Sequence, residues 1–214
     1  MKETIIDSYA RLPMGTYLDI QAVNADETRE DVDKQVGIIA LLTNKSEREI
    51  LTMPIADYRE LAAAAEFLGE QPRIPHRIAD AYVCGDFKLK PTRDLTKITT
   101  AQYIDFQTFA PEGEAKAVEL LSVFLVPEGL AYNDGYDIAE VQAAIRANLT
   151  VLDALALTAF FLRRYAALIK ATETSLSRRI RKERNKAKRE KIETAMERLR
   201  RAKSLLTAGA GSVR

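Results

Sequence analysis

The chain has 214 residues, of which 47% are hydrophobic and 29% are charged. This balance excludes wholesale disorder and favours one domain or two small ones. Its single cysteine, Cys84, and single histidine, His76, exclude a disulfide framework within the chain, and they exclude zinc sites of the Cys₄ or Cys₂His₂ type.

The first predicted element is a helical unit over about residues 11–70. It opens with Arg11-Leu-Pro-Met-Gly-Thr-Tyr-Leu-Asp-Ile-Gln21 and continues through an acidic stretch into the apolar helix 36–42. Ser46-Glu-Arg-Glu49 is a capping-box pattern, in which a short side chain and a glutamate satisfy each other's backbone amides, and it predicts the start of the next helix. That helix ends near Pro54, and a last helix follows it.

A β-hairpin is predicted over about residues 77–91. Gly85-Asp86 suits a two-residue turn, and beyond it apolar Phe87 and Leu89 alternate with two lysines. The segment 4–8 near the N-terminus is a candidate for a further short strand.

A second helical unit, over about residues 97–170, repeats the first. Lys97-Ile-Thr-Thr-Ala-Gln-Tyr-Ile-Asp-Phe-Gln107 matches residues 11–21 at an offset of 86, with identical Tyr, Asp and Gln. An apolar helix over 118–125, the capping pattern Asp137-Ile-Ala-Glu140 and a final helix from Val151 follow in the same order as in the first unit. We expect the two units to stack pseudo-symmetrically around one shared core.

The C-terminal part differs from this acidic body, residues 1–172. Residues 178–203 contain 13 Lys or Arg and 4 Glu, a net charge of +9, while residues 1–177 carry −9. The composition predicts a long basic helix over 173–206 and a flexible tail over 207–214. Ile192, Met196, Leu199 and Leu206 recur at helical spacing, so the last turns of this helix have a face that can dock. The predicted fold class is thus mainly α, with two pseudo-repeated helical units, a short hairpin between them and a long basic C-terminal helix.

Membrane and export signals are weak in this sequence. The most apolar stretch, 151–162, is about twelve residues long and contains Asp153, whereas a span needs roughly 20 apolar residues. The N-terminus has no apolar core of the signal-peptide type. We therefore expect a cytoplasmic protein with no membrane partner.

Candidate catalytic residues are few. The repeated Asp19 and Asp105 could share a proton as paired carboxylates do, but bulky residues follow both, and a helix-entry role is the simpler interpretation. His76 has no second histidine for a metal site and no fixed nucleophile beside it. The carboxylates between Asp26 and Asp33 lack the spacing of an EF-hand. We expect no enzyme activity, no cofactor and no metal.

The basic stretch is the candidate binding site. Its residues are Arg178, Arg179, Arg181, Lys182, Arg184, Lys188 and Arg189. The sequence leaves three possible partners for these cations: an acidic protein surface, a second copy of the chain, or nucleic acid. Since no aromatic residues interleave with these cations, nucleic acid would be bound non-specifically and in a salt-dependent manner.

The repeated Tyr-Leu/Ile-Asp stretches, 11–21 and 97–107, resemble a motif of small tailed-bacteriophage proteins, Ile-Thr-x-Gly-x-Tyr-Ile-Asp-Leu. The aromatic segment 160–165 leading into the basic C-terminus is also similar, whereas Pro13 and Ala101 depart from the motif. The resemblance implies a phage tail-assembly chaperone or another morphogenesis protein. Such a protein would be helical, non-enzymatic and located in the host cytoplasm, and it would bind a phage client such as the tape-measure protein.

Two other functions stay open. One is a structural virion protein whose basic helix contacts packaged DNA or neighbouring subunits. The other is an acid–base hydrolase that uses Asp19 and Asp105.

Overall fold

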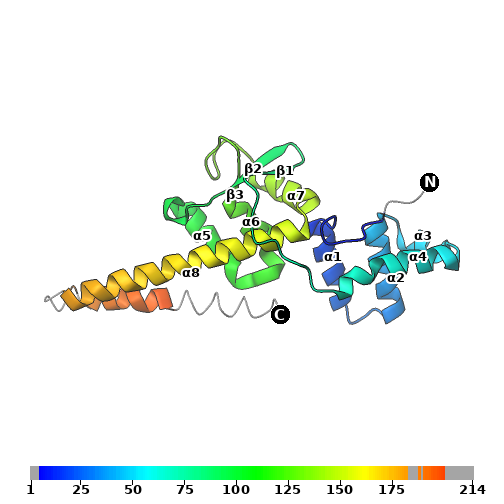
Figure 1. The fold of residues 1–214 in the computed structure, drawn as a ribbon, viewed down its shortest axis with the longest axis horizontal. Coiled ribbons are helices and arrows are strands. Elements are labelled where there is room, and N and C mark those ends of the chain that lie inside the picture. The colour runs from blue at the N-terminus through cyan, green and yellow to red at the C-terminus, as the bar shows by residue number, and fades with distance from the viewer. Residues whose placement is uncertain (1–4, 183–187, 189, 201–214) are drawn as a thin grey trace.

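A computed structural model describes residues 5–182, 188 and 190–200. The described chain is mainly helical, with one small antiparallel sheet, and it is elongated along the helix that begins at Val151 (Figure 1). The predicted fold class is therefore confirmed.

The first unit consists of short helices around two small cores. Its elements are α1 (Met14–Ala25), α2 (Asp31–Thr43), α3 (Glu47–Thr52), α4 (Ile55–Ala64) and the 3₁₀ helix η1 (Ala65–Gly69). Both bonds of the predicted capping box at Ser46 and Glu49 are present at the start of α3. Asn44 ends α2 in the left-handed region, with φ 54°, and Pro54 precedes α4.

The predicted hairpin is confirmed and gains a third strand. Strands β1 (Tyr82–Cys84) and β2 (Phe87–Pro91) pair around a turn in which Gly85 has φ 57°, and β2 also pairs with β3 (Leu125–Pro127). The apolar run predicted as helix to Leu125 therefore ends as helix at Phe124. The N-terminal strand prediction is wrong for residues 5–8, which form no strand.

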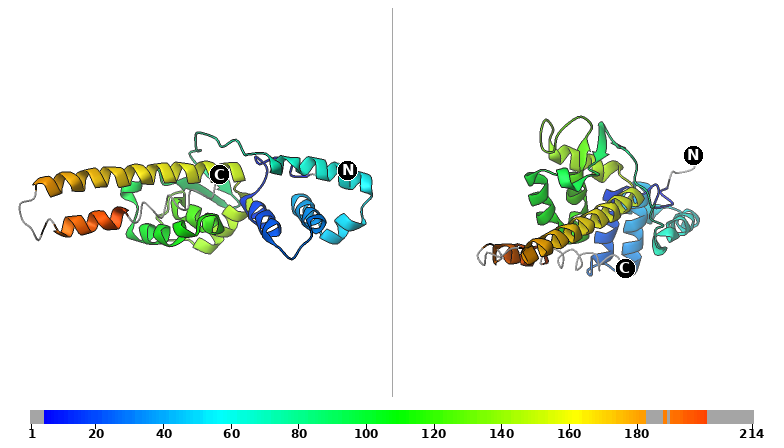
Figure 2. Two further views of the ribbon diagram at one scale, coloured as in Figure 1. Left: turned by 90° about the horizontal axis from the view of Figure 1, so that it is seen from below. Right: turned by 60° about the vertical axis from the view of Figure 1, so that its left-hand side comes forward.

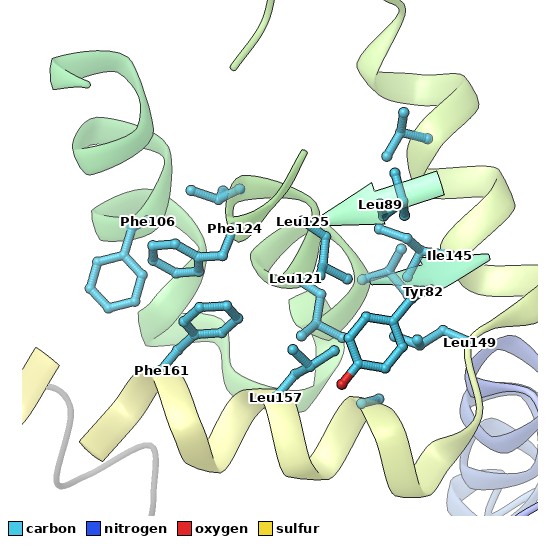
Figure 3. Close-up of a cluster of buried hydrophobic side chains, with 14 of the residues drawn as sticks. Tyr82, Leu89, Phe106, Leu121, Phe124, Leu125, Ile145, Leu149, Leu157 and Phe161 are labelled. Atoms are coloured by element: carbon cyan, nitrogen blue, oxygen red, sulfur yellow. The ribbon is translucent and has the colours of Figure 1, made fainter. Parts of the chain in front are cut away.

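The second unit carries the main core. Its elements are η2 (Leu95–Lys97), α5 (Thr100–Phe109), η3 (Ala110–Lys116), α6 (Ala117–Phe124), α7 (Ile138–Asn148) and α8 (Val151–Lys182). Figure 3 shows side chains from α5, α6, α7, α8 and the sheet converging on this core. The rings of Phe124 and Phe161 stack with centroids 4.5 Å apart, which ties α8 to α6.

The internal repeat appears as the same order of four helices. α1 begins at Met14 and α5 at Thr100, the offset of the matching motifs, and α4 and α8 begin at the corresponding Ile55 and Val151. The packed pairs also correspond, because α2 contacts α1, α3 and α4 just as α6 contacts α5, α7 and α8. The units do not share one core, however. The apolar residues form three clusters, one of which combines Val151 of α8 with Leu12, Ile20 and Leu42 of the first unit.

The two units join through α1. The amide of Met14 donates to the carbonyl of Leu149 at 2.7 Å, and the amide of Val151 donates to the carbonyl of Leu12 at 2.9 Å. Leu12 and Val151 are both fully buried at this junction. The start of α1 and the start of α8 are therefore fixed to each other by a short antiparallel bridge.

Candidate functional site

Helix α8 is packed on the body in its first half and projects beyond it in its second. Buried side chains recur along the first half at helical spacing, at Val151, Ala154, Leu157, Phe161, Tyr165 and Ile169. After Ile169 the described side chains of α8 are half-buried or exposed. The change occurs because the aromatic and aliphatic residues that would bury against the body give way to Thr, Ser, Glu and Arg.

A second helical segment, residues 190–200, runs back along this projecting half (Figures 1 and 2). Ile192, Met196 and Leu199 are half-buried, the hydroxyl of Ser177 lies 3.9 Å from the sulfur of Met196, and Leu199 packs against the main core. The docking face predicted for the C-terminal turns therefore docks on α8 of the same chain. We call α8 beyond Ile169 together with residues 190–200 the arm.

The arm differs from the single helix predicted over 173–206. Residue 173 lies in the middle of α8, and residues 190–200 run antiparallel to it. The end of the predicted helix, 201–206 with Leu206, and the predicted tail, 207–214, lie outside the described residues. The difference has a physical reason. The apolar face of residues 190–200 is removed from water by packing against the half-buried face of α8.

The predicted binding residues fall at the far end of the arm. Arg178 is exposed on α8, and Arg179, Arg181 and Lys182 occupy the last turn of that helix. Lys188 is exposed and helical, whereas Arg184 and Arg189 lie outside the described residues. This end of α8 is the extremity of the molecule opposite α3 and α4 (Figure 1). The structure thus places basic residues at one end and the acidic first unit at the other.

Exposed apolar side chains on α5 lie at the base of the arm. Tyr103 is 44% exposed and Ile104 is 56% exposed. α5 is fixed to α8 by a hydrogen bond from the Gln107 amide to the Tyr165 hydroxyl, 2.9 Å long. At 1.5 Å per residue, Arg178 lies about 20 Å farther along α8 than Tyr165. The sequence analysis did not identify this apolar pair. The residues that flank an isoleucine in the sequence do not show whether its side chain is exposed or buried in the core.

The repeated aspartates act as separate structural ties. Asp19 on α1 forms an ion pair with Arg146 on α7, and Asp105 on α5 accepts a hydrogen bond of 2.8 Å from the hydroxyl of Tyr132. Burial and the neighbouring carboxylate raise the pKa of Tyr132, so its hydroxyl stays protonated and donates. Because α1 and α5 lie apart (Figure 1), the two carboxylates are not brought together as a proton-sharing pair would be.

The other residues considered for catalysis or metal binding do not form a site with one another. His76 is exposed, and Cys84 is fully buried, with its pKa raised to about 11 by burial and by Asp153. Asp26 accepts hydrogen bonds from Thr28, which lower the pKa of its carboxyl. Among the residues that the structure describes, no cluster of His, Cys, Asp or Glu is suited to hold a metal ion.

The described helices were also compared with the length and hydropathy that a membrane span requires. None of them combines enough residues with enough apolar character to cross a bilayer.

Comparisons of the chain with models of known protein families, with curated protein sequences and with solved structures gave no match.

Proposed function

We propose that the chain is a non-enzymatic, protein-binding assembly factor of the tail-assembly chaperone type. The observation that carries this proposal is the arm, whose basic end projects from a body of opposite charge. The resemblance of residues 11–21 and 97–107 to small phage proteins supplies the more specific identity, with a phage protein such as the tape-measure protein as the client.

In the proposed mechanism the arm and α5 act together on one client. The basic end of the arm attracts an acidic client surface, which raises the rate of encounter and fixes its orientation. Tyr103 and Ile104 then cover an apolar side of the client at the base of the arm. A helical client segment of about 13 residues matches the roughly 20 Å of α8 between Tyr165, to which α5 is bonded, and Arg178.

A charge-neutralised variant tests the role of the arm. It replaces Arg178, Arg179, Arg181 and Lys182 by Gln. A matched control removes the same charge from exposed positions outside the arm, by replacing Arg48, Arg59, Lys97 and Arg163 by Gln. Tagged proteins are used to capture partners from the native lysate, with washes at low and then high salt. The retained proteins are identified by mass spectrometry, and nucleic acid is measured at 260 nm.

The proposal expects one protein client to be retained by the parent chain and the control, and to be lost from the arm variant. Equal retention by both variants would remove the arm from the binding surface. Nucleic acid released by salt, with no protein client, would favour the structural virion alternative, in which the basic segment contacts packaged DNA. The presence of the chain in purified particles would favour the same alternative, because a chaperone is left behind after assembly.

A further inference from the structure

The segment that links the two units, residues 70–81, crosses the surface without regular secondary structure (Figure 1). It begins after η1 and ends at β1. All five residues from Arg73 to Arg77 are exposed, and Pro72 just before them is half-buried. Within the part of the chain that the structure describes, no hydrogen bond or ion pair involves residues 73–77. These side chains are thus presented to solvent by a backbone anchored at both ends.

The sequence restricts the backbone of this segment over residues 71–75. Pro72 and Pro75 have φ fixed near −65° by their rings. The residues before them, Gln71 and Ile74, are excluded from the helical region by contact with the proline ring. Four of the five residues 71–75 are therefore held near the polyproline II conformation, which needs no internal hydrogen bonds.

Polyproline II geometry arranges the side chains in a definite way. With three residues per turn, Pro72 and Pro75 share one edge of the extended helix, and Ile74 lies on a neighbouring edge. The chain bends at His76 and Arg77, so this geometry ends at Pro75. The exposed part of the segment therefore carries an apolar residue followed by proline, Ile74-Pro75, with a cation two positions later in the sequence. Ile74 is 38% exposed, so much of its apolar side chain is uncovered by the fold.

We propose that Pro72-Arg-Ile-Pro-His-Arg77 is a docking segment for a protein module of the SH3 type. Such modules bind polyproline II segments in grooves lined by aromatic side chains. Ile74-Pro75 occupies one aromatic pocket, Gln71-Pro72 occupies the next, and Arg77 pairs with an acidic pocket at the end of the groove. Because Pro72 is half-buried, Ile74-Pro75 and Arg77 supply most of the contact. This site does not depend on the arm.

The chemistry favours a protein over a nucleic acid as the partner. Pro72, Ile74 and Pro75 offer neither a donor for phosphate nor a ring for stacking on a base. A nucleic acid would respond only to the charge of the segment, so Arg73 and Arg77 would contribute alike. A proline-recognition groove distinguishes these two arginines, because only Arg77 follows the Ile74-Pro75 dipeptide at the spacing of a Pro-x-Arg motif.

The absence of tryptophan from the chain gives a direct assay. The full-length protein is titrated into an isolated SH3 domain that is selective for Pro-x-x-Pro-x-Arg. Binding is followed by the fluorescence of the groove tryptophan of that domain, excited where tyrosine absorbs little. We expect saturable binding that Pro75→Ala and Arg77→Gln each weaken by roughly tenfold or more, and that Arg73→Gln weakens by less than about twofold. Far-UV circular dichroism checks that the exposed substitutions leave the fold intact.

Three results would overturn the proposal. Equal weakening by Arg73→Gln and Arg77→Gln would show attraction by charge alone, as a nucleic acid also produces. Binding of a synthetic peptide of residues 70–78 without binding of the full-length chain would show that the fold shields the segment. Absence of binding by both the chain and the peptide would remove the segment as a ligand altogether.

Discussion

Gly15 in α1 lies directly against Arg146 in α7. A Cβ at position 15 would be 2.5 Å from the Cγ of Arg146 and 2.6 Å from its carbonyl oxygen. The second of these atoms belongs to the backbone, so it cannot move without displacing α7. The absence of a side chain at Gly15 is therefore what allows the two units to approach so closely.

We expect Gly15→Ala to destabilise the protein by about 1–3 kcal/mol, the usual range for overpacking. Gly37→Ala is the matched control, since Gly37 lies inside α2 and its added Cβ would come close only to the ends of the Arg29 and Glu47 side chains, with Val23 Cγ1 at an ordinary contact distance of 3.4 Å. Those ends can move, and alanine favours helix over glycine by up to about 1 kcal/mol. Urea unfolding of the two variants measures the difference, and equal stabilities would contradict the close packing of α1 on α7.

The two copies of the repeated aspartate give a second prediction. Tyr132 is buried and donates to the half-buried Asp105, so Tyr132→Phe should cost about 1–2 kcal/mol of unfolding free energy by leaving that carboxylate without its donor. Asp19 and Arg146 are each nearly half exposed, and Asp19→Asn should therefore cost less than about 1 kcal/mol. Added salt should reduce only the second effect. A larger loss of unfolding free energy from Asp19→Asn than from Tyr132→Phe would contradict this ranking of the two interactions.

Part of this architecture could be predicted because its causes are local. Ser46, Pro54 and Gly85 each determine a helix start or a turn through their own side chain or backbone, and the repeat then predicts where α5 begins. β3 could not be predicted, because Leu125 continues an apolar run that is compatible with helix. It becomes a strand only by pairing with Pro91, far upstream in the sequence.

The arm is a second feature that the sequence predicts only in part. The spacing of Met196 and Leu199 predicted a face that docks, but helical periodicity contains no information about the partner. The concentration of positive charge in the C-terminal part could be found by counting. Its location at one extremity of the molecule depends on the packing of α8, and so does the exposure of Ile104.

Alkaline pH should weaken the fold through Cys84. Its thiol has a pKa raised by burial to about 11, whereas in the unfolded chain it ionises near pH 9. Its contribution to stability is complete below pH 9 and is lost as the pH rises from 9 through 11, with a slope of at most about 1.4 kcal/mol per pH unit. Chemical unfolding from pH 8 to 11 measures this slope.

Cys84→Ala is the control for the alkaline effect. Tyr132 and Tyr165 also have raised pKa values, so part of the loss above pH 10 should persist in this variant. Between pH 9 and 10 its unfolding free energy should change less with pH than that of the parent chain. An unchanged slope in that interval would assign the alkaline transition to the tyrosines alone.

The antiparallel arm is open to a chemical test, because the only native cysteine is buried. The hydroxyl of Ser177 and the sulfur of Met196 are 3.9 Å apart, so Ser177→Cys combined with Met196→Cys should form a disulfide under mild oxidation. Ser175 is exposed two residues away on α8, on a different side of the helix, and Ser175→Cys with Met196→Cys should cross-link far more slowly. Free-thiol counts on the unfolded chain and non-reducing electrophoresis give the yields. Equal yields from both pairs would mean that residues 190–200 do not pack on α8 in this register, and the binding surface would then have to be sought on a free basic helix.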